Sequence, residues 1–231
     1  MVSERFCNFS GRLIFLTHYL THYMTDGAGR IGRSTAGKAV SMGNNLAYQA
    51  DSWDELIDGK LVAMSPRPSV NHHQVSLNIA NIFSRYLKGK TCRPFGDGVD
   101  LYLTEQDRFI PDGMIVCDTR KIRRNGIYGA PDLVVEVLSP STARYDRGHK
   151  KDVYEKAGVR EYWIVEPDSK AIEVYLLKNG KFALDNVYSV YPDDLLEKMT
   201  EEEKQAVPAA FHCSLYDDLL VSIEEVFSDT F

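Results

Sequence analysis

One glutamate lies inside an apolar run, and its position calls for a chemical explanation. Glu136 is the fourth residue of LVVEVLS (133–139), a stretch rich in Leu and Val that is typical of a fully buried strand. A buried carboxylate is costly unless it is protonated, paired or bound to a cation. Glu136 is therefore a candidate site residue, and the plainer alternative is a buried pair with an arginine.

A second carboxylate, Asp112, lies in the preceding apolar stretch, FIPDGMIVC (109–117). Consecutive strands can lie side by side, roughly 5 Å apart, so Asp112 and Glu136 are expected to be close to each other. Two carboxylates at that spacing repel unless they share a proton or a cation, and Mg²⁺ or Mn²⁺ suits oxygen ligands. With a lysine added, the set could hydrolyse phosphodiesters. Turn chemistry between Pro111 and Gly113 would also explain Asp112.

A strand, helix and strand must position Glu136. The segment 140–151 contains four Lys or Arg residues, and the helical pattern that follows stops at Gly158, a favourable residue for a helix C-terminus. The next apolar run, EYWIVE (161–166), predicts a second strand. The four basic residues are Arg144, Arg147, Lys150 and Lys151.

Upstream of Asp112, the pattern predicts a hairpin, a helix and a strand. The hairpin covers 56–64 with Asp58-Gly59 as its turn, and Glu55 stands just before it. Apolar residues at three- and four-residue spacing predict a helix over 71–87, with His72 and His73 in its first turn. The alternation at 99–103 predicts a strand.

Downstream of the central unit, turn residues predict a hairpin over 171–184 with Asn179-Gly180 as its turn. The stretch 193–204 is acidic and helical in composition, and 215–227 is amphipathic. The basic stretch 119–129, TRKIRRNGIYG, is expected to form an exposed loop that either follows a phosphate backbone or is simply solvated. The order of elements predicts a mixed sheet with helices packed on it.

Composition limits the class of protein. Hydrophobic residues make up 44% and charged residues 26%, which is ordinary for a globular chain, and no apolar run approaches the roughly 20 residues that span a bilayer. We therefore expect no membrane contact and, by default, a cytoplasmic protein. The net charge of -6 opposes nucleic-acid binding unless a local basic patch overcomes it.

The cysteines and the N-terminal region give two further expectations. The four cysteines are far apart, with no CxxC pair, which argues against a zinc knuckle or a disulfide framework. Residues 1–42 are expected to be a flexible extension and 43–231 a single domain with a C-terminal helical segment. Met42 precedes the first well-patterned sequence and is a hypothetical natural start, which mass spectrometry of the native protein would test.

Several motifs together resemble one protein family. The stretches ELIDGKLVAMSP, HHQVS, PDGMIV, PDLVVEVLSPST, DRGHK and GVREYWIV are similar to those of the bacterial Uma-two (Uma2) endonuclease family, within the PD-(D/E)xK restriction-endonuclease-like superfamily. The resemblance covers about residues 51–177. It implies an α/β (α+β) restriction-endonuclease-like fold, with a mixed central sheet flanked by helices. It also implies a metal-dependent endonuclease acting on DNA.

The resemblance implies roles for particular residues. Asp112 and Glu136 match the metal-binding pair for Mg²⁺ or Mn²⁺, with the carbonyl of Val137 as a further ligand, and Lys150 matches the catalytic lysine. The superfamily lysine normally stands two residues after the glutamate, where this chain has Leu138. If neither Lys150 nor Lys151 reaches the carboxylates, the site is degenerate.

Three other residues are auxiliary candidates. Glu55 matches an acidic residue near the first hairpin, although a surface acid is an equal alternative. His73 is a candidate base or phosphate contact, against a structural role at the helix start. Asp132 is expected to cap a turn or to support the site from roughly 13 Å away.

Dimers are frequent in the superfamily, so a homodimer is expected by analogy. The main rival is an inactive nucleic-acid-binding or protein-interaction module on the same fold. A hydrolase of another phosphate ester is a weaker alternative.

Overall fold

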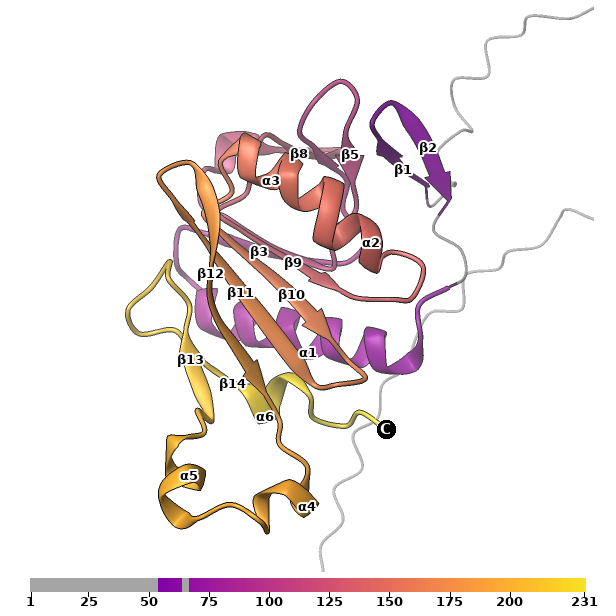
Figure 1. Cartoon of the computed structure of the whole chain (residues 1–231). Coiled ribbons are helices and arrows are strands. Elements are labelled where there is room, and N and C mark those ends of the chain that lie inside the picture. Colours follow the sequence, from indigo (N-terminus) through magenta and orange to yellow (C-terminus); the bar gives the residue numbers. More distant parts are fainter. Residues whose placement is uncertain (1–53, 64–66) are drawn as a thin grey trace, which may run out of the picture. The chain divides into compact units, whose positions relative to one another are not determined.

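The most apolar strands lie together in one six-stranded sheet, called the central sheet below (Figure 1). The computed structural model describes residues 54–63 and 67–231. Strands β9 and β10 run parallel, and the other neighbouring pairs run antiparallel, which makes this sheet mixed, as predicted. The strands in spatial order are β12 (Lys181–Ser189), β11 (Ala171–Lys178), β10 (Glu161–Glu166), β9 (Leu133–Val137), β6 (Gly113–Val116) and β3 (Arg93–Gly96).

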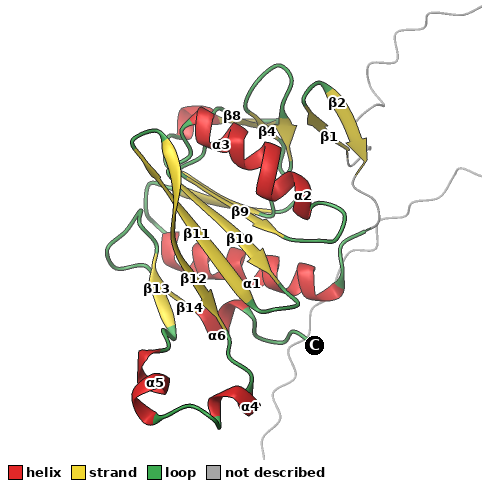
Figure 2. Cartoon of the chain, in the orientation of Figure 1, coloured by secondary structure: helices red, strands yellow, loops and turns green. Residues whose placement is uncertain are grey.

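Helices connect the parallel pair and cover the central sheet (Figure 2). Between β9 and β10 the chain forms α2 (Ala143–Tyr145), a π-helical turn (Asp146–Lys150) and α3 (Lys151–Ala157). Gly158 follows with a φ of 88°, which confirms the predicted helix end. Helix α1 (Val70–Leu87) confirms the helix predicted over 71–87, and the Ser69 side chain caps its start.

Alternating side chains of β9 build two apolar layers. Val135 and Val137 pack with α1 and the C-terminal elements, whereas Val134 packs with α3 and with a second sheet. All five residues of β9 are buried, as the apolar run predicts. Glu136 occurs at an even position like Val134, so it faces the layer between the two sheets.

The second sheet corrects one predicted strand. The stretch 109–117 is divided between β5 (Arg108–Phe109), in the second sheet, and β6, in the central sheet. Pro111 lies at the division, and because proline has no N–H it cannot continue a ladder. The spatial order of this sheet is β2 (Lys60–Ala63), β1 (Asp54–Ile57), β5, β4 (Leu101–Tyr102), β8 (Gly126–Tyr128) and β7 (Ile122–Arg123).

The basic stretch 119–129 is more ordered than the expected loop. It forms a 3-10 turn (Thr119–Lys121) followed by the β7–β8 hairpin. Ile127 is buried and pairs with Leu101 of β4, which anchors the hairpin in the second sheet. This pairing is the reason that a stretch rich in Arg and Gly is not simply a solvated loop.

Both predicted two-residue hairpin turns are confirmed. Strands β1 and β2 turn at Asp58-Gly59, where φ is 50° and 73°. Strands β11 and β12 turn at Asn179-Gly180, where φ is 53° and 75°. Positive φ at both central residues matches the twist of the flanking strands and explains why these dipeptides are reliable signals.

The cysteine expectation is wrong for one pair. Cys92 and Cys117 form a disulfide. They flank neighbouring strands, because β3 pairs with β6 and Arg93 lies opposite Val116. A separation of 25 residues in sequence hides this proximity, which arises from strand pairing.

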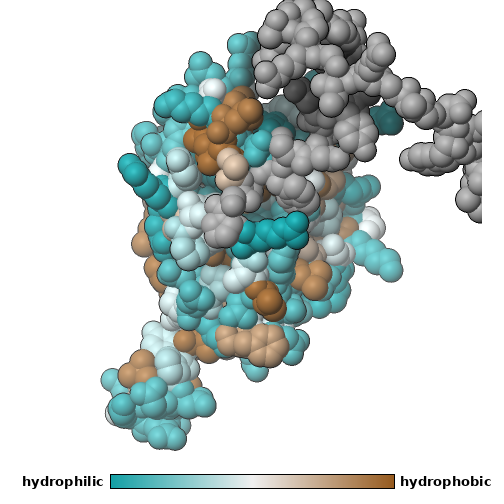
Figure 3. All heavy atoms as spheres, turned by 90° about the vertical axis from the view of Figure 1, so that its right-hand side faces the viewer, coloured by the Kyte–Doolittle hydropathy of each residue, from teal (hydrophilic) through white to brown (hydrophobic). Residues whose placement is uncertain are grey.

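The C-terminal region confirms the acidic helical stretch and adds two short strands. Helices α4 (Asp193–Leu196) and α5 (Glu201–Ala206) lie in a segment that is mainly hydrophilic (Figure 3). Strands β13 (Ala210–His212) and β14 (Leu220–Ser222) and helix α6 (Ile223–Val226) follow. The apolar residues of the amphipathic stretch 215–227, such as Val221 and Val226, join the core.

Three expectations concern residues outside this description. The extension 1–42, the boundary at 42/43 and the hypothetical start at Met42 fall outside the described residues and stay predictions. Among the residues from 54 onward that are described, no helix combines the length and the apolar character needed to cross a bilayer.

Gly126 gives a stability test of the second sheet. Its φ is 144°, and a Cβ there would lie 2.5 Å from the Asp100 carbonyl oxygen, which already accepts the Ile127 N–H. Gly126→Ala should therefore lower the free energy of unfolding by about 2–4 kcal/mol. Gly89→Ala has a positive φ of 81° but open space, and should cost about 1 kcal/mol. Urea unfolding of both variants measures the difference, and equal losses would contradict the packing argument.

Candidate functional site

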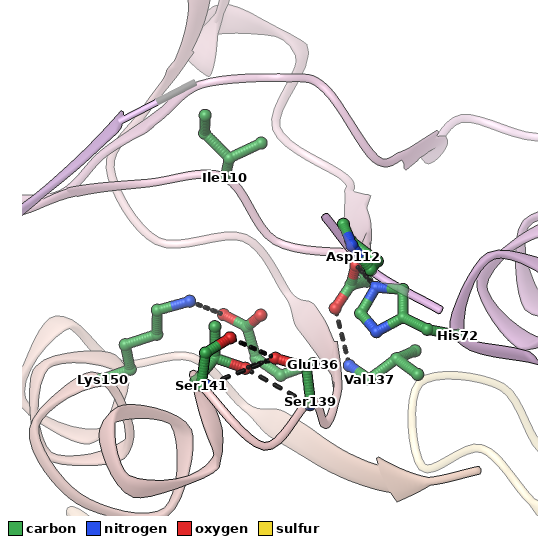
Figure 4. Close-up of a pocket in the computed structure, with 10 residues that line it drawn as sticks. His72, Ile110, Asp112, Glu136, Val137, Ser139, Ser141 and Lys150 are labelled. Carbon is green, nitrogen blue, oxygen red and sulfur yellow. Dashed lines mark hydrogen bonds and ion pairs between the residues drawn. The ribbon is translucent and has the colours of Figure 1, made fainter. Parts of the chain in front are cut away.

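The two predicted carboxylates line one pocket (Figure 4). In the antiparallel pair of β6 and β9, Gly113 lies opposite Val135, and continuing that register puts Asp112 opposite Glu136. The enclosed space is about 20 Å³, room for roughly one water-sized group. The lining residues are Pro68, His72, Ile110, Asp112, Glu136, Val137, Ser139, Ser141, Thr142 and Lys150.

Asp112 is held from two directions. Its Oδ2 accepts a hydrogen bond from the Val137 N–H at 2.7 Å, and its Oδ1 lies 2.7 Å from Nε2 of His72. Burial disfavours the charged form of His72, but the hydrogen bond and the charge of Asp112 outweigh it and raise the pKa of His72. The side chain of Asp112 is therefore oriented before any ligand arrives.

Glu136 is buried, and one of its two carboxylate oxygens contacts neighbouring side chains. Its Oε1 accepts the Tyr154 hydroxyl at 2.6 Å and lies 3.2 Å from Nζ of Lys150, while no described residue donates to Oε2. Burial raises the pKa of Glu136 well above its ordinary value, against the opposing charge of Lys150. Nearby carboxylates raise it further, so this position favours a proton or a cation.

Lys150 is the buried positive charge of the site. Its Nζ lies 2.9 Å from Oε1 of Glu55 and 3.2 Å from oxygens of both Glu136 and Asp146. Burial alone would lower the pKa of Lys150, but these three carboxylates raise it well above its ordinary value. These carboxylates therefore favour the charged ammonium, which can donate hydrogen bonds.

A π-helical turn brings Lys150 to the carboxylates. In this turn Gly148 has φ -114° and ψ -106°, a conformation outside the helical range. Such turns interrupt α-helices and occur frequently at functional sites. Leu138, which takes the usual lysine position, is buried in the apolar layer instead.

Glu55 and Asp146 complete the charged cluster. Glu55 also accepts the Ile110 N–H at 2.8 Å, which ties β1 to the link between β5 and β6. Asp146 is buried, and its carboxylate oxygens make no well-aligned hydrogen bond to any described residue, so its contact with Lys150 is an ion pair. Sequence patterns singled out Glu55 but not Asp146, whose signal was its position four residues before Lys150.

The other auxiliary candidates lie away from the pocket. Lys151 lies with its ammonium 3.5 Å from the ring centre of Tyr175. Asp132 accepts the Cys117 N–H at 2.8 Å, which agrees with a supporting role in a turn.

Val137 lines the pocket and contacts Asp112 through its N–H, while the predicted ligand role of its carbonyl stays a prediction.

His72 takes the place expected for its neighbour. His73 is not among the lining residues, whereas His72 is buried beside Asp112. His72 precedes the buried Val75 by three residues and Ile79 by seven, so it continues the apolar face of α1. That spacing is the signal that distinguishes the two histidines.

The charge balance of the cluster fits a divalent cation. Among the residues that the structure describes, four buried carboxylates face at most two positive side chains, Lys150 and His72. Among residues 54–63 and 67–231, no three His, Cys, Asp or Glu side chains are arranged to enclose a metal. The fitting arrangement is therefore two hard oxygen ligands, with water or backbone oxygens completing the shell. The carboxylates are Glu55, Asp112, Glu136 and Asp146.

Solved structures include one with this fold. A crystal structure of a protein from Anabaena variabilis ATCC 29413, described as a "putative nuclease belonging to DUF820", matches with a TM-score of 0.57 and 21% identity. The match covers 76% of this chain and 89% of that chain. At this identity the likeness shows the fold alone, and the fold is restriction-endonuclease-like, as predicted.

Sequence comparisons find two relatives in Synechocystis sp. (strain ATCC 27184 / PCC 6803 / Kazusa). The uncharacterized protein slr1290 is 32% identical over 123 residues, which are 52% of this chain and 64% of that protein. The uncharacterized protein sll1609 is 25% identical over 131 residues, which are 55% of this chain and 73% of that protein. The chain thus spans less than two thirds of the length of slr1290.

A family model decides the relationship. The model of the Uma2 family, described as "Putative restriction endonuclease", matches residues 47–209, which is most of the chain. The matched region contains every residue of the charged cluster and the whole connection between β9 and β10. The motifs that resembled this family are therefore explained by common descent, and the chain belongs to the Uma2 family.

Proposed function

We propose that this chain is a metal-dependent endonuclease that hydrolyses phosphodiester bonds in DNA. The observation that carries the proposal is the buried cluster of four carboxylates, which outnumber the positive side chains that the described residues place beside them, with Asp112 and Glu136 both lining one pocket. The family description and the nuclease-like fold support the same class of reaction. Asp112 and Glu136 would hold Mg²⁺ or Mn²⁺, with the Val137 carbonyl as the predicted further ligand.

The protein side chains orient and balance the charges of the reaction. A divalent cation at this position would activate water and neutralise negative charge on the phosphate. His72 and the Val137 N–H fix the carboxylate of Asp112, and Tyr154 fixes that of Glu136. Such preorganised groups need no rearrangement during the reaction, which is the main source of electrostatic catalysis.

Lys150 assists the attacking water through its positive charge. The surrounding carboxylates raise the pKa of Lys150, which favours its charged form. Its distance of 3.2 Å from Glu136 keeps the positive charge beside the proposed cation ligand. In this role Lys150, which lies in the π-helical turn, replaces the lysine that the superfamily pattern places at the position of Leu138.

DNA as substrate requires local positive charge against the net charge of -6. The β7–β8 hairpin and the turn before it carry Arg120, Lys121, Arg123 and Arg124. Arg123 stacks on the ring of Tyr128 at 4.1 Å, while Arg120 is paired with Asp118. We propose that this hairpin contacts the phosphate backbone, and that the attraction comes from Lys121, Arg123 and Arg124, which form no ion pair with a described residue.

The test combines metal binding with DNA cleavage. Mn²⁺ is titrated calorimetrically into the wild type and into Asp112→Ala, and the same metal-purged and metal-loaded samples are tested for nicking of supercoiled plasmid. We expect binding and nicking by the wild type and loss of both in Asp112→Ala. Asp193→Ala, an exposed carboxylate on α4, is the control that should change neither. Nicking by metal-purged Asp112→Ala at the wild-type rate would refute the assignment.

The rival function is favoured by one observation. Leu138 replaces the usual superfamily lysine, and a module that kept the fold could bind nucleic acid or a protein without cleaving. Steep salt dependence of DNA binding without turnover would support the nucleic-acid-binding alternative. The homodimer expected by analogy is a separate prediction, which sedimentation velocity can test on the same samples.

A further inference from the structure

Three hydroxyl side chains line the wall of the pocket that follows β9. Ser139, Ser141 and Thr142 belong to the loop between Val137 and α2, and all three line the pocket with Glu136 (Figure 4). Ser139 and Thr142 are half-buried, whereas Ser141 is exposed at the mouth. None of these hydroxyls has a part in the proposed metal site.

Ser139 and Thr142 hold the shape of this loop. The Ser139 N–H donates to Oγ1 of Thr142 at 3.4 Å, and the Thr142 N–H donates to Oγ of Ser139 at 3.3 Å. Their two oxygens lie 3.0 Å apart. Such reciprocal bonds are the ordinary structural use of Ser and Thr in turns, so these two residues position the loop.

Ser141 has hydrogen-bonding capacity to spare. Its Oγ lies 3.0 Å from Oγ of Ser139, and it makes no other hydrogen bond to a described residue. A hydroxyl offers one donor and two acceptor sites, so at least one site remains for a ligand. His72, which also lines the pocket, has a buried Nδ1 without a hydrogen-bond partner among the described residues. Two residues that line the pocket, Ser141 and His72, therefore have hydrogen-bonding groups that no described residue uses.

A substrate phosphate needs donors that the charged residues do not provide. The ammonium of Lys150 already faces three carboxylates within 3.2 Å, and the carboxylates of Asp112 and Glu136 have no hydrogen to donate. The enclosed space of about 20 Å³ is too small for a nucleotide, so a phosphodiester must approach from the mouth. Ser141 offers a neutral donor at that mouth.

We infer that Ser141 donates a hydrogen bond to a non-bridging oxygen of the substrate phosphodiester. Ser139 and Thr142 hold Ser141 in place. This inference rests on the proposed nuclease function and names a residue that binds the substrate at the same site. Because the contact is to the ground-state phosphate as well as to the transition state, its loss should weaken binding more than turnover.

The test is the steady-state cleavage of a short DNA duplex with Mn²⁺ by Ser141→Ala. We expect KM to rise about tenfold with kcat within about twofold of the wild type, which is the effect of losing one hydrogen bond to a charged group. Ser141→Thr keeps the hydroxyl and should restore KM. Ser84→Ala, an exposed serine on α1, is the matched control and should behave as the wild type.

The outcomes separate this inference from the function on which it rests. A wild type that cleaves, with an unchanged KM in Ser141→Ala, overturns the role of Ser141 alone. A raised KM together with weaker Mn²⁺ binding in calorimetry also overturns it, because Ser141 would then support the metal site. A metal-loaded wild type that neither binds nor cleaves DNA overturns both proposals together.

Discussion

Replacing Lys150 with methionine should lower the free energy of unfolding by about 3–5 kcal/mol. The ammonium is buried, and it is the positive charge nearest to Glu55, Glu136 and Asp146, each within 3.2 Å. Methionine fills a similar volume, so the loss reports charge compensation more than packing. Thermal or urea unfolding measures the change, which corresponds to a fall in Tm of order 10 °C.

The loss of unfolding free energy caused by Lys150→Met should depend on pH. The folded-state pKa values of Glu136 and Asp146 are already raised by burial, and removal of the ammonium raises them further. A carboxyl with a raised folded-state pKa stabilises the fold at low pH, and this contribution is lost as pH rises through the folded pKa. The variant should therefore lose less stability at about pH 5 than at about pH 8.

Lys151→Met is the matched control for this charge effect. Lys151 is the next residue, but its ammonium lies over the ring of Tyr175 rather than among carboxylates. Its replacement should cost less than about 1 kcal/mol. Equal losses in the two variants, or a deficit in Lys150→Met that does not change with pH, would contradict the buried cluster as described.

Replacing Glu136 with glutamine should abolish Mn²⁺ binding and reduce DNA nicking by about two to three orders of magnitude. Glutamine keeps an acceptor for the Tyr154 hydroxyl, which now donates to Oε1 at 2.6 Å. It removes the negative charge that a cation requires. Calorimetric titration of Mn²⁺ and plasmid nicking on the same preparation measure both effects, and unfolding experiments should show a well-folded variant.

Glu161→Gln is the control for replacing a buried strand glutamate. Glu161 begins β10 and is fully buried, and it accepts hydrogen bonds from Nε1 of Trp163 and from the Ser214 N–H. Its replacement should destabilise the fold by about 1–3 kcal/mol, because an amide presents N–H groups to these donors. Mn²⁺ binding should remain unchanged. If Glu136→Gln binds Mn²⁺ with wild-type affinity, Glu136 is not a ligand of the metal.

Local patterns predicted the elements that position the site. The Asn179-Gly180 turn, the apolar face of α1 and the run LVVEV each depend on neighbouring residues, and each is found where expected. The division at Pro111 was missed although proline cannot continue a ladder, because the apolar residues on both sides suggested one strand. The pairing of Cys92 with Cys117 depends on which strands become neighbours, which no local pattern contains.

The candidate site was only partly predictable for the same reason. Glu136 was conspicuous because charge in an apolar strand is costly, and Asp112 because it lies at the entrance of the next strand. His72 could have been chosen over His73 from helical spacing alone. The convergence of Glu55, Asp146 and Glu136 on Lys150 required three-dimensional packing, since the pair Lys150 and Glu136 is separated by 14 positions.

The π-helical turn at Asp146–Lys150 makes the length of this segment as important as its composition. A π-helical turn corresponds to a helical turn with one inserted residue, and each helical residue rotates the chain by about 100°. Because Gly148 already kinks the backbone in this segment, losing one residue between Thr142 and Lys150 would change the direction of the ammonium and turn it away from Glu136. Among relatives, an alignment gap in this segment therefore predicts loss of the site even where the lysine itself is kept.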